Sequence, residues 1–473
     1  MSAPELSAAL FQRGANIHIV GIGGAGMSAI ARVLIGRGAR VSGSDRALND
    51  QAAALAALGA QIHEGHAASH LQAPDVVLIS SAISPENPEV EAALAAGIPV
   101  LRRREALPLL LEGALQIAVA GTHGKTTTTA LIAHILREAG RDPSYIVGGT
   151  LLNSGDNARH GGGDAFVIEA DEYDYMFLGL TPTIAVLTNL EHDHPDMFPT
   201  FAEMQRAFEQ FIARIPEYDG VLIACADDPH VLALAKARRS GGQPTLTYSL
   251  YSAEADWRGA LSDGGLLIEG VQDGQAVRAI ARLPLYGAHN AQNSLAAVAA
   301  ACVYGVPLSQ AAAALSSFRG TARRFEVMGA ARGVTVINDY AHHPTAIRAT
   351  LRAARERFPA ATLWAVWQPH TYSRTRLLQD EFINAFADAD HVLITDIYGA
   401  RELPQPDDPS AERLAALMRQ RTGKSARHSG SLAQTAAYLA ESVCADSAVI
   451  LLRAGDAPRI GEQLLAALSQ RAE

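Results

Sequence analysis

The sequence of 473 residues has few cysteines, few positive charges and no long apolar run. Its three cysteines, Cys225, Cys302 and Cys444, are widely separated and form no CxxC pair, so neither a disulfide framework nor a zinc site is expected. No segment approaches the roughly 18 consecutive apolar residues of a membrane-spanning helix. A net charge of −10 excludes an overall basic footprint for nucleic acid. We expect a cytoplasmic protein, a monomer or weak homodimer, that binds neither nucleic acid nor a membrane.

Lysine is the rarest cation in the chain. Only Lys125, Lys236 and Lys424 occur, so arginine supplies the other 36 of the 39 basic residues. A lysine that persists where arginine is the default cation is expected to do something that a guanidinium cannot do. Hydrophobic residues make up 48% and charged residues 19% of the chain, the balance of a globular protein. A chain of this length is expected to form two to four domains.

Short apolar runs alternate with amphipathic stretches along most of the sequence. The apolar runs predict buried strands at Asn16–Val20, Val76–Ser80, Leu115–Ala120, Ala165–Glu169, Ile184–Asn189, Val221–Ala224, Val334–Asn338, Leu363–Gln368, His391–Thr395 and Ala448–Arg453. The amphipathic stretches predict helices such as Ala25–Gly36, Lys125–Ala139, Asn290–Tyr304, Pro344–Arg357 and Arg374–Phe386. Alternation of this kind predicts parallel sheets covered by helices, the doubly wound α/β class.

Two segments interrupt the alternation. Residues 155–164 are rich in Gly, Asn and Asp and are expected to form a loop, and residues 255–284 lose the helical period, which predicts a small antiparallel excursion. Boundaries are expected near residues 112–113 and 318–322. We therefore predict a Rossmann-like N-terminal domain, a central P-loop ATPase-type domain with a parallel sheet and a Rossmann-like C-terminal domain, spanning residues 1–112, 113–320 and 321–473.

The central loop carries the strongest motif. It follows the predicted strand Leu115–Ala120, precedes a helix and consists of Gly121, Thr122, His123, Gly124, Lys125, Thr126 and Thr127. Glycines let backbone N–H groups surround phosphate oxygens, and the helix N-terminus adds its positive dipole. Lys125 is expected to reach the terminal phosphates of ATP, and Thr126 to bind Mg²⁺. The general pattern has glycine where this chain has Val119, and a tight strand-to-helix turn is the alternative interpretation.

A second glycine loop follows the first predicted strand. Gly21, Gly23, Gly24 and Gly26 fit the G-x-G-x-x-G pattern, and Asp45 follows about twenty residues later. This arrangement predicts a diphosphate on a helix N-terminus and a ribose on the acid. It does not distinguish a nicotinamide dinucleotide from a UDP-linked ligand, and a purely structural turn is a further alternative.

Acidic and histidine side chains follow two other predicted strands. Glu169 and Glu172 end one strand, and His192 and His194 lie at the end of the next. Carboxyl ends of neighbouring parallel strands face the same crevice. A carboxylate and a neutral imidazole can therefore complete the coordination of a Mg²⁺ held by Thr126. Surface histidines without a ligand are the alternative.

The last third of the chain contains two polar clusters at predicted strand ends, residues 338–344 and 368–374. Their position suggests the edge of a site, although the bare patterns are weak. Arg323 and Arg324 lie near the proposed domain junction, where they could reach a γ-phosphate or remain a solvated pair.

Taken together, these segments resemble the Mur ligases. The similarity is carried by HIVGIGGAGMSAIA, SSAISPENPE, AVAGTHGKTTTT, EADEYD, TNLEHDHPD, GAHNAQNSLAA, ARRFE, NDYAHHPTAI and QPHTYSRTR, which run from residue 18 to residue 376. The resemblance implies an ATP- and Mg²⁺-dependent ligase that joins L-alanine to the lactyl carboxylate of UDP-N-acetylmuramate through an acyl phosphate. It also implies that the 21–26 loop holds UDP and not a nicotinamide dinucleotide.

The resemblance implies further roles by position. Glu169 and His194 match magnesium ligands. The nucleotide contacts are Asn290 and Asn293 for adenine, Arg324 for the γ-phosphate and Asp339 for the ribose. Tyr340, His342 and Arg374 match the amino-acid pocket, and His342 is a candidate general base on position alone.

Two details refine the resemblance and leave alternatives open. Other branches of the family carry a carbamylated lysine after the metal histidine, but no lysine lies between Lys125 and Lys236, which is typical of the alanine-adding branch and its peptide-recycling relative. Many alanine-adding ligases have arginine where this chain has Thr371. The alternatives are a recycling ligase for a murein peptide, an NAD-dependent oxidoreductase and an ATPase that is not a ligase.

Overall fold

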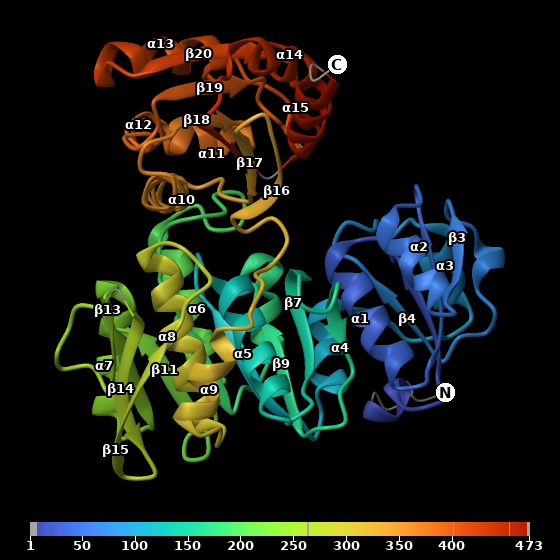
Figure 1. Ribbon diagram of the computed structural model, residues 1–473. Coiled ribbons are helices and arrows are strands. Elements are labelled where there is room, and N and C mark those ends of the chain that lie inside the picture. The colour runs from blue at the N-terminus through green and yellow to red at the C-terminus, as the bar shows by residue number, and fades with distance from the viewer. Residues whose placement is uncertain (1–6, 263, 401, 454, 471–473) are drawn as a thin grey trace. The chain divides into compact units, whose positions relative to one another are not determined.

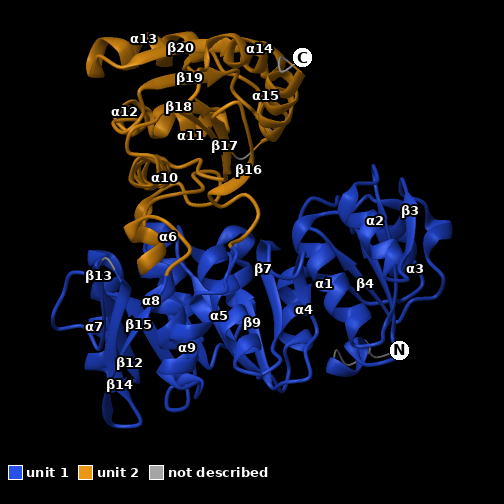
Figure 2. Ribbon diagram, viewed as in Figure 1, with its two compact units in different colours: residues 1–190, 202–282, 292–319 blue, residues 191–201, 283–291, 320–473 orange. Residues whose placement is uncertain are grey.

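The computed structural model describes residues 7–262, 264–400, 402–453 and 455–470, and it contains three β-sheets (Figure 1). The chain divides into two compact units, coloured separately in Figure 2. Unit 1 comprises Met1–Leu190, Ala202–Arg282 and Gln292–Arg319, and unit 2 comprises Glu191–Phe201, Leu283–Ala291 and Gly320–Glu473. Unit 1 holds the first two sheets and unit 2 the third.

The first sheet is parallel and has the order β3-β2-β1-β4-β5. Its strands are β1 (Asn16–Val20), β2 (Arg40–Asp45), β3 (Gln61–Glu64), β4 (Val76–Ile79) and β5 (Val100–Arg102). The helical segments are η1 (Ala8–Phe11), α1 (Ala25–Gly36), α2 (Asp50–Ala57), η2 (Ala68–His70), α3 (Pro88–Ala95) and α4 (Arg103–Leu110). The chain leaves β1 towards β2 on one side and later returns to β4 on the other. The carboxyl end of β1 is therefore a topological switch point, the usual ligand position in such sheets.

The second sheet has ten strands in the order β15-β14-β13-β12-β11-β10-β6-β9-β7-β8. They are β6 (Leu115–Ala120), β7 (Ser144–Leu151), β8 (Asp156–Arg159), β9 (Ala165–Glu169), β10 (Ile184–Leu187), β11 (Val221–Cys225), β12 (Thr245–Ser249), β13 (Trp257–Ser262), β14 (Gly265–Gln272) and β15 (Gln275–Ala281). The helical segments are α5 (Lys125–Glu138), η3 (Tyr173–Gly179), α6 (Phe201–Ile212), α7 (Pro229–Ser240), α8 (Ala288–Val303) and α9 (Leu308–Leu315). Strand β6 pairs in parallel with β9 and β10, so the carboxyl ends of these three strands share one edge.

The third sheet has the order β16-β17-β21-β18-β19-β20, with β16 antiparallel to its neighbour. Its strands are β16 (Glu326–Ala331), β17 (Val334–Asp339), β18 (Thr362–Trp367), β19 (His391–Thr395), β20 (Ser425–Gly430) and β21 (Ser447–Leu452). Its helices are α10 (Pro344–Arg357), α11 (Tyr372–Leu377), α12 (Gln379–Ile383), α13 (Ala411–Thr422), α14 (Leu432–Ser442) and α15 (Pro458–Gln470). Successive residues of a strand face opposite sides. Ile337 therefore packs in one core with Leu351 of α10, whereas Val336 packs in a second core with Leu464 of α15.

The predicted α/β class with three sheet-based domains is confirmed, while the exact domain boundaries stay a prediction. The antiparallel excursion is confirmed, because β13, β14 and β15 pair as antiparallel neighbours. Within the described part of the chain, none of the helices combines the length and the apolar character that crossing a membrane requires.

Two local predictions are wrong. The loop expected at residues 155–164 contains β8, which pairs antiparallel with β7 after a turn at Gly155, where φ is +76°. The glycine content signalled the turn and concealed the short strand beside it. The helix expected at Arg374–Phe386 is two short helices, α11 and α12, because Leu378 between them has φ −106° and ψ 22° and ends the first helix.

Candidate active site

The phosphate-loop sequence forms the connection between β6 and α5, as predicted. Gly121 has φ +135°, and a Cβ there would lie 2.0 Å from Thr188 Oγ1, so the position requires glycine. Asn189, which follows β10, accepts from His123 N through Oδ1 at 2.8 Å and from Thr122 N through its carbonyl at 3.0 Å. The loop is thus fixed from the neighbouring strand while α5 presents its N-terminus at the same sheet edge.

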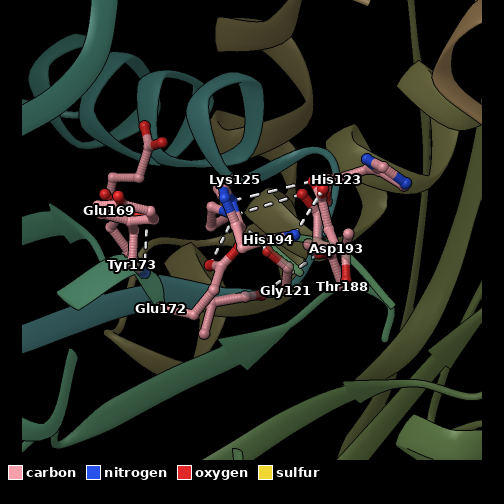
Figure 3. A network of polar contacts seen from close by, with 12 residues as sticks. Gly121, His123, Lys125, Glu169, Glu172, Tyr173, Thr188, Asp193 and His194 are labelled. Carbon is pink, nitrogen blue, oxygen red and sulfur yellow. Dashed lines mark hydrogen bonds and ion pairs between the residues drawn. The ribbon is translucent and has the colours of Figure 1, made fainter. Parts of the chain in front are cut away.

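Lys125 is held inside this loop by a buried carboxylate (Figure 3). Its Nζ donates to Gly121 O at 2.6 Å and to both carboxylate oxygens of Glu172, at 2.8 and 2.9 Å. Glu172 is fully buried. Burial by itself would lower the pKa of Lys125, but the negative charges of Glu172 and Asp171 outweigh it and raise the pKa. The ammonium group is therefore kept charged in the loop by protein groups alone.

Two of the three predicted magnesium ligands meet in unit 1. Thr126, in the first turn of α5, donates from Oγ1 to Glu169 Oε1 at 3.1 Å. The other oxygen of Glu169 accepts from Gly148 N at 2.7 Å. A hydroxyl and a carboxylate side by side are hard oxygen donors of the kind that Mg²⁺ binds. The third predicted ligand, His194, belongs to unit 2, where it has φ +53° and its N–H donates to Asp193 Oδ1 at 2.7 Å.

The two predicted adenine residues both lie on α8. Asn293 faces the phosphate loop, because a Cβ built on Gly124 would lie 2.4 Å from Asn293 Oδ1. Asn290 donates from Nδ2 to Tyr286 O at 2.8 Å. The structure therefore brings Asn293 next to the loop, and the adenine role of both residues stays a prediction.

The 21–26 loop lies at the carboxyl end of β1, at the switch point of the first sheet. Gly21 N and Ile22 N donate to Ser44 O at 2.8 and 3.1 Å, and Gly23 N donates to Asp45 Oδ2 at 2.9 Å. Asp45 thus supports the loop directly, in addition to its predicted contact with a ribose. Helix α1 begins at Ala25, so the last two residues of the 21–26 loop already belong to its first turn.

A buried carboxylate supports the end of β2 beneath this loop. Glu89 of α3 has no exposed surface; its oxygens accept from Ser44 Oγ and lie 2.7 Å from His70 Nδ1, 3.1 Å from His66 Nδ1 and 3.6 Å from His18 Nε2. Burial would raise the pKa of Glu89, but the interactions with His18, Ser44, His70 and His66 outweigh it and lower the pKa to about 2.

This low pKa predicts an acid-sensitive contribution to stability. A pKa lowered from 4.5 to about 2 corresponds to about 3 kcal/mol of folding free energy. The contribution is complete above pH 4.5, where the carboxylate is ionised in both states, and it is lost as the pH falls towards 2. We expect Glu89→Gln to lower the melting temperature at pH 7 and the difference from wild type to shrink below pH 4.5, measured by calorimetry. Glu91→Gln, on the exposed side of the same helix, is the matched control, and an equal effect of both variants contradicts the prediction.

Unit 2 contains a buried ion pair built from two segments of the predicted site. Arg374 of α11 donates from Nε and Nη2 to Asp193 Oδ1, at 2.9 and 2.8 Å, and its Nη1 lies 3.0 Å from His370 Nδ1. Both side chains of the pair are about 5% exposed. Burial would raise the pKa of Asp193, but the charges of Arg374 and His194 hold it well below its usual range. Arg374 is thus paired with Asp193, and its predicted role in the amino-acid pocket would require that a carboxylate ligand share or replace this partner.

His342 lies beside this pair. Its Nδ1 is 2.8 Å from Tyr340 O and its Nε2 is 3.9 Å from Asp193 Oδ2. Burial, reinforced by the charge of Arg374, lowers the pKa of His342 well below its usual value. The imidazole is therefore neutral at physiological pH, which a general base requires.

The remaining predicted residues of unit 2 surround Tyr340. The guanidinium groups of Arg324 and Arg323 lie 5.1 and 5.4 Å from its ring centroid. The two carboxylate oxygens of Asp339 accept from Phe325 N and Ala341 N, both at 2.8 Å. Burial raises the pKa of Asp339 against the opposing charge of Arg324. The aromatic ring thus holds Arg324 in place, while the backbone bonds fix Asp339.

The two buried acids that hold the central cations have no local sequence signal that reveals this role. Glu172 lies within the acidic motif after β9, but its pairing with Lys125 crosses 47 residues, and the pairing of Asp193 with Arg374 crosses 181. The available signal was that each acid stands in a motif with a predicted magnesium ligand, Glu172 with Glu169 and Asp193 with His194.

Three protein-family descriptions match the chain. "Mur ligase family, catalytic domain" matches residues 16–114, "Mur ligase middle domain" residues 119–301 and "Mur ligase, glutamate ligase domain" residues 323–455. Together they cover most of the chain.

Individual relatives agree with these matches. The UDP-N-acetylmuramate–L-alanine ligase of Renibacterium salmoninarum is 48% identical over 82% of this chain and 83% of its own length, and that of Rubrobacter xylanophilus is 43% identical over 96% and 100%. Among solved structures, the UDP-N-acetylmuramate–alanine ligase of Thermotoga maritima has a TM-score of 0.76 at 26% identity, covering 97% of this chain and 100% of its own. A murein peptide ligase of Psychrobacter arcticus has a TM-score of 0.70 at 29% identity, covering 96% and 99%. The chain therefore belongs to the Mur ligase family and is an ATP-dependent ligase.

Proposed function

We propose that the chain joins L-alanine to the lactyl carboxylate of UDP-N-acetylmuramate at the expense of ATP, a step in peptidoglycan precursor synthesis. The observation that carries the proposal is the phosphate loop with Lys125 held inside it. The chain is also 43% identical over nearly its whole length to the UDP-N-acetylmuramate–L-alanine ligase of Rubrobacter xylanophilus. A diphosphate-type glycine loop in the first sheet supports the choice of a UDP sugar. The expected compartment is the cytoplasm, and the expected state is a monomer or weak homodimer.

The proposed reaction has two steps. The lactyl carboxylate attacks the γ-phosphorus of ATP, ADP leaves and an acyl phosphate forms. The neutral amine of L-alanine then attacks the acyl carbon, phosphate leaves and the amine loses a proton. In the first step, Lys125 and Arg324 are proposed to stabilise the charge on the transferring oxygens. In the second, neutral His342 is the proposed base, and Tyr340 and Arg374 line the amino-acid pocket.

Magnesium fits the donors that unit 1 provides. Thr126 and Glu169 are proposed to bind it, and His194 of unit 2 is the third proposed ligand. When bound, the ion would neutralise phosphate charge. The N-terminus of α5 is proposed to orient the phosphates, and Glu172 and Asp171 keep Lys125 charged.

Removing a metal ligand should change the requirement for the ion. We expect Glu169→Gln and His194→Ala each to raise the Mg²⁺ concentration that gives half the maximal rate, by roughly tenfold or more, because each removes one proposed ligand. Initial rates across a Mg²⁺ titration measure this effect. If both variants keep the wild-type magnesium dependence, these residues have only structural roles.

The proposed function is tested by phosphate release with each substrate omitted in turn. Release is expected only when ATP, UDP-N-acetylmuramate and an amino acid are all present. ATP turnover at the full rate without an amino acid would contradict the ligase, and a nicotinamide absorbance change would instead support the oxidoreductase alternative.

The peptide-recycling alternative needs its own comparison, since a murein peptide ligase is among the structural relatives. A pocket formed around one methyl group should reject a tripeptide for steric reasons. ADP formation with L-alanine and with an L-Ala-γ-D-Glu-containing tripeptide at matched concentrations separates the two. A faster reaction with the tripeptide would favour the recycling ligase.

A further inference from the structure

An arginine outside the predicted site lies against the first turn of α1. A Cβ built on Gly26 would lie 2.4 Å from Arg103 Nη1, so the missing side chain of Gly26 is what makes room for the guanidinium. Arg103 is the first residue of α4, and its side chain is 27% exposed. It is therefore packed in place and still accessible to a ligand.

The position is electrostatically unusual. The N-terminus of a helix carries partial positive charge, so a cation beside it is unfavourable unless an anion shares the site. Helix α1 itself offers no such anion, because its N-cap is Gly24, which provides no side-chain bond, and its first turn contains no acidic residue. Among the described residues, the carboxylate placed at this end is that of Asp45, which accepts from Gly23 N one residue before the N-cap. By contrast, α2 in the same domain has Asn49 at its N-cap, accepting from Ala52 N, and Asp50 in its first turn. The two positive features at α1 thus converge beside the 21–26 loop.

The acidic partner that the structure gives Arg103 is distant. Arg103 Nη2 lies 3.6 Å from Asp171 Oδ2, longer than a hydrogen bond between these groups. The Asp171 side chain is 35% exposed, so solvent weakens the pair further. A guanidinium presents five N–H donors in a planar fork that suits phosphate oxygens. Exchange of Asp171 for a diphosphate would therefore replace a weak contact by a strong one.

We propose that Arg103 is a binding residue for the diphosphate of the UDP sugar, acting together with the N-terminus of α1. The inference rests on the proposed function of the 21–26 loop and adds to it a residue that discriminates by phosphate charge. Arg103 should therefore contribute to the binding of UDP but not to that of uridine, which lacks phosphate.

The test is calorimetric titration of the whole chain with UDP and with uridine. A charge-assisted hydrogen bond is typically worth about 1.5–3 kcal/mol, so Arg103→Ala should weaken UDP binding roughly ten- to hundredfold. Uridine affinity should change less than twofold. Arg102→Ala removes the preceding, exposed arginine and is the matched control, expected to bind UDP like wild type. In turnover, Arg103→Ala should raise the KM for UDP-N-acetylmuramate and leave kcat and the KM for ATP nearly unchanged.

The possible outcomes distinguish the role of Arg103 from the proposed UDP-binding role of the 21–26 loop. Equal UDP affinity in Arg103→Ala, Arg102→Ala and wild type overturns the role of Arg103 and leaves the UDP site standing. A wild-type chain that binds ATP but neither UDP nor UDP-N-acetylmuramate overturns the UDP site itself. If Arg103→Ala does not fold, Arg103→Gln replaces it. This variant keeps a long polar side chain and loses the charge, so unchanged UDP affinity in it also overturns the inference.

Discussion

Replacing Lys125 with alanine is expected to reduce ligation by about a hundredfold to a thousandfold while UDP affinity stays near the wild-type value. Loss of one preorganised group that stabilises transition-state charge has an effect of this size. The 21–26 loop, which is proposed to bind UDP, is built from β1, β2 and α1, which do not include the phosphate loop. Phosphate release and calorimetric titration with UDP measure the two effects.

The structure adds a complication to this experiment. Glu172 is fully buried against Lys125, so the single variant leaves an uncompensated carboxylate, which typically costs about 3–5 kcal/mol of stability. The double variant Lys125→Ala/Glu172→Gln should recover the melting temperature and remain inactive. Recovery of activity in the double variant would show that Lys125 acts only by neutralising Glu172. Loss of UDP binding in the stable double variant would indicate that the two loops form one site.

Replacing Arg374 with alanine is expected to have two separable effects. The apparent affinity for L-alanine should fall roughly ten- to hundredfold, because a charge-assisted hydrogen bond is lost, while the KM for ATP hardly changes. The free energy of unfolding should also fall by about 3–5 kcal/mol, because Asp193 remains buried without its partner. Initial rates across an L-alanine titration and denaturant melts measure these quantities.

A substitution of Asp193, the other member of the pair, distinguishes a role of Arg374 in binding L-alanine from a role in packing. Arg374→Ala/Asp193→Asn should regain most of the stability but none of the alanine affinity. If the double variant also regains alanine affinity, Arg374 only maintains the fold of the pocket. Thr371→Arg, where many alanine-adding ligases have arginine, is expected to be tolerated and serves as a nearby substitution that preserves the pair.

The parts of the site that could be predicted are those encoded locally. The phosphate loop and the 21–26 loop each follow a strand within a few residues, and glycine at Gly121 is required by φ +135° and by Thr188 beside it. Strand β1 and helices α1 and α10 begin and end where the residue patterns place them. Such features depend on the backbone conformation of a few neighbouring residues, and the types of those residues indicate that conformation directly.

The parts that could not be predicted depend on tertiary packing. Nothing in the local pattern indicates that Glu172 holds Lys125 or that Asp193 holds Arg374, since each pair is chosen by how strands and helices come together. Arg103 stands in a run of three arginines, and only the fold shows which of them faces α1. The break at Leu378 between α11 and α12 was equally invisible, because the surrounding residues favour a helix.

The environments of the three lysines determine which of them will react first with amine-directed reagents. Lys125 is buried with a raised pKa, and Lys424 Nζ donates to the carbonyls of Ala387 and Ala389, whereas Lys236 lies exposed on α7. Acylating reagents need an accessible, unprotonated amine, so among the lysines they should modify Lys236 first. Among the lysines, a dye or biotin should therefore attach mainly to Lys236, which lies on α7 and is far from both glycine loops in the sequence.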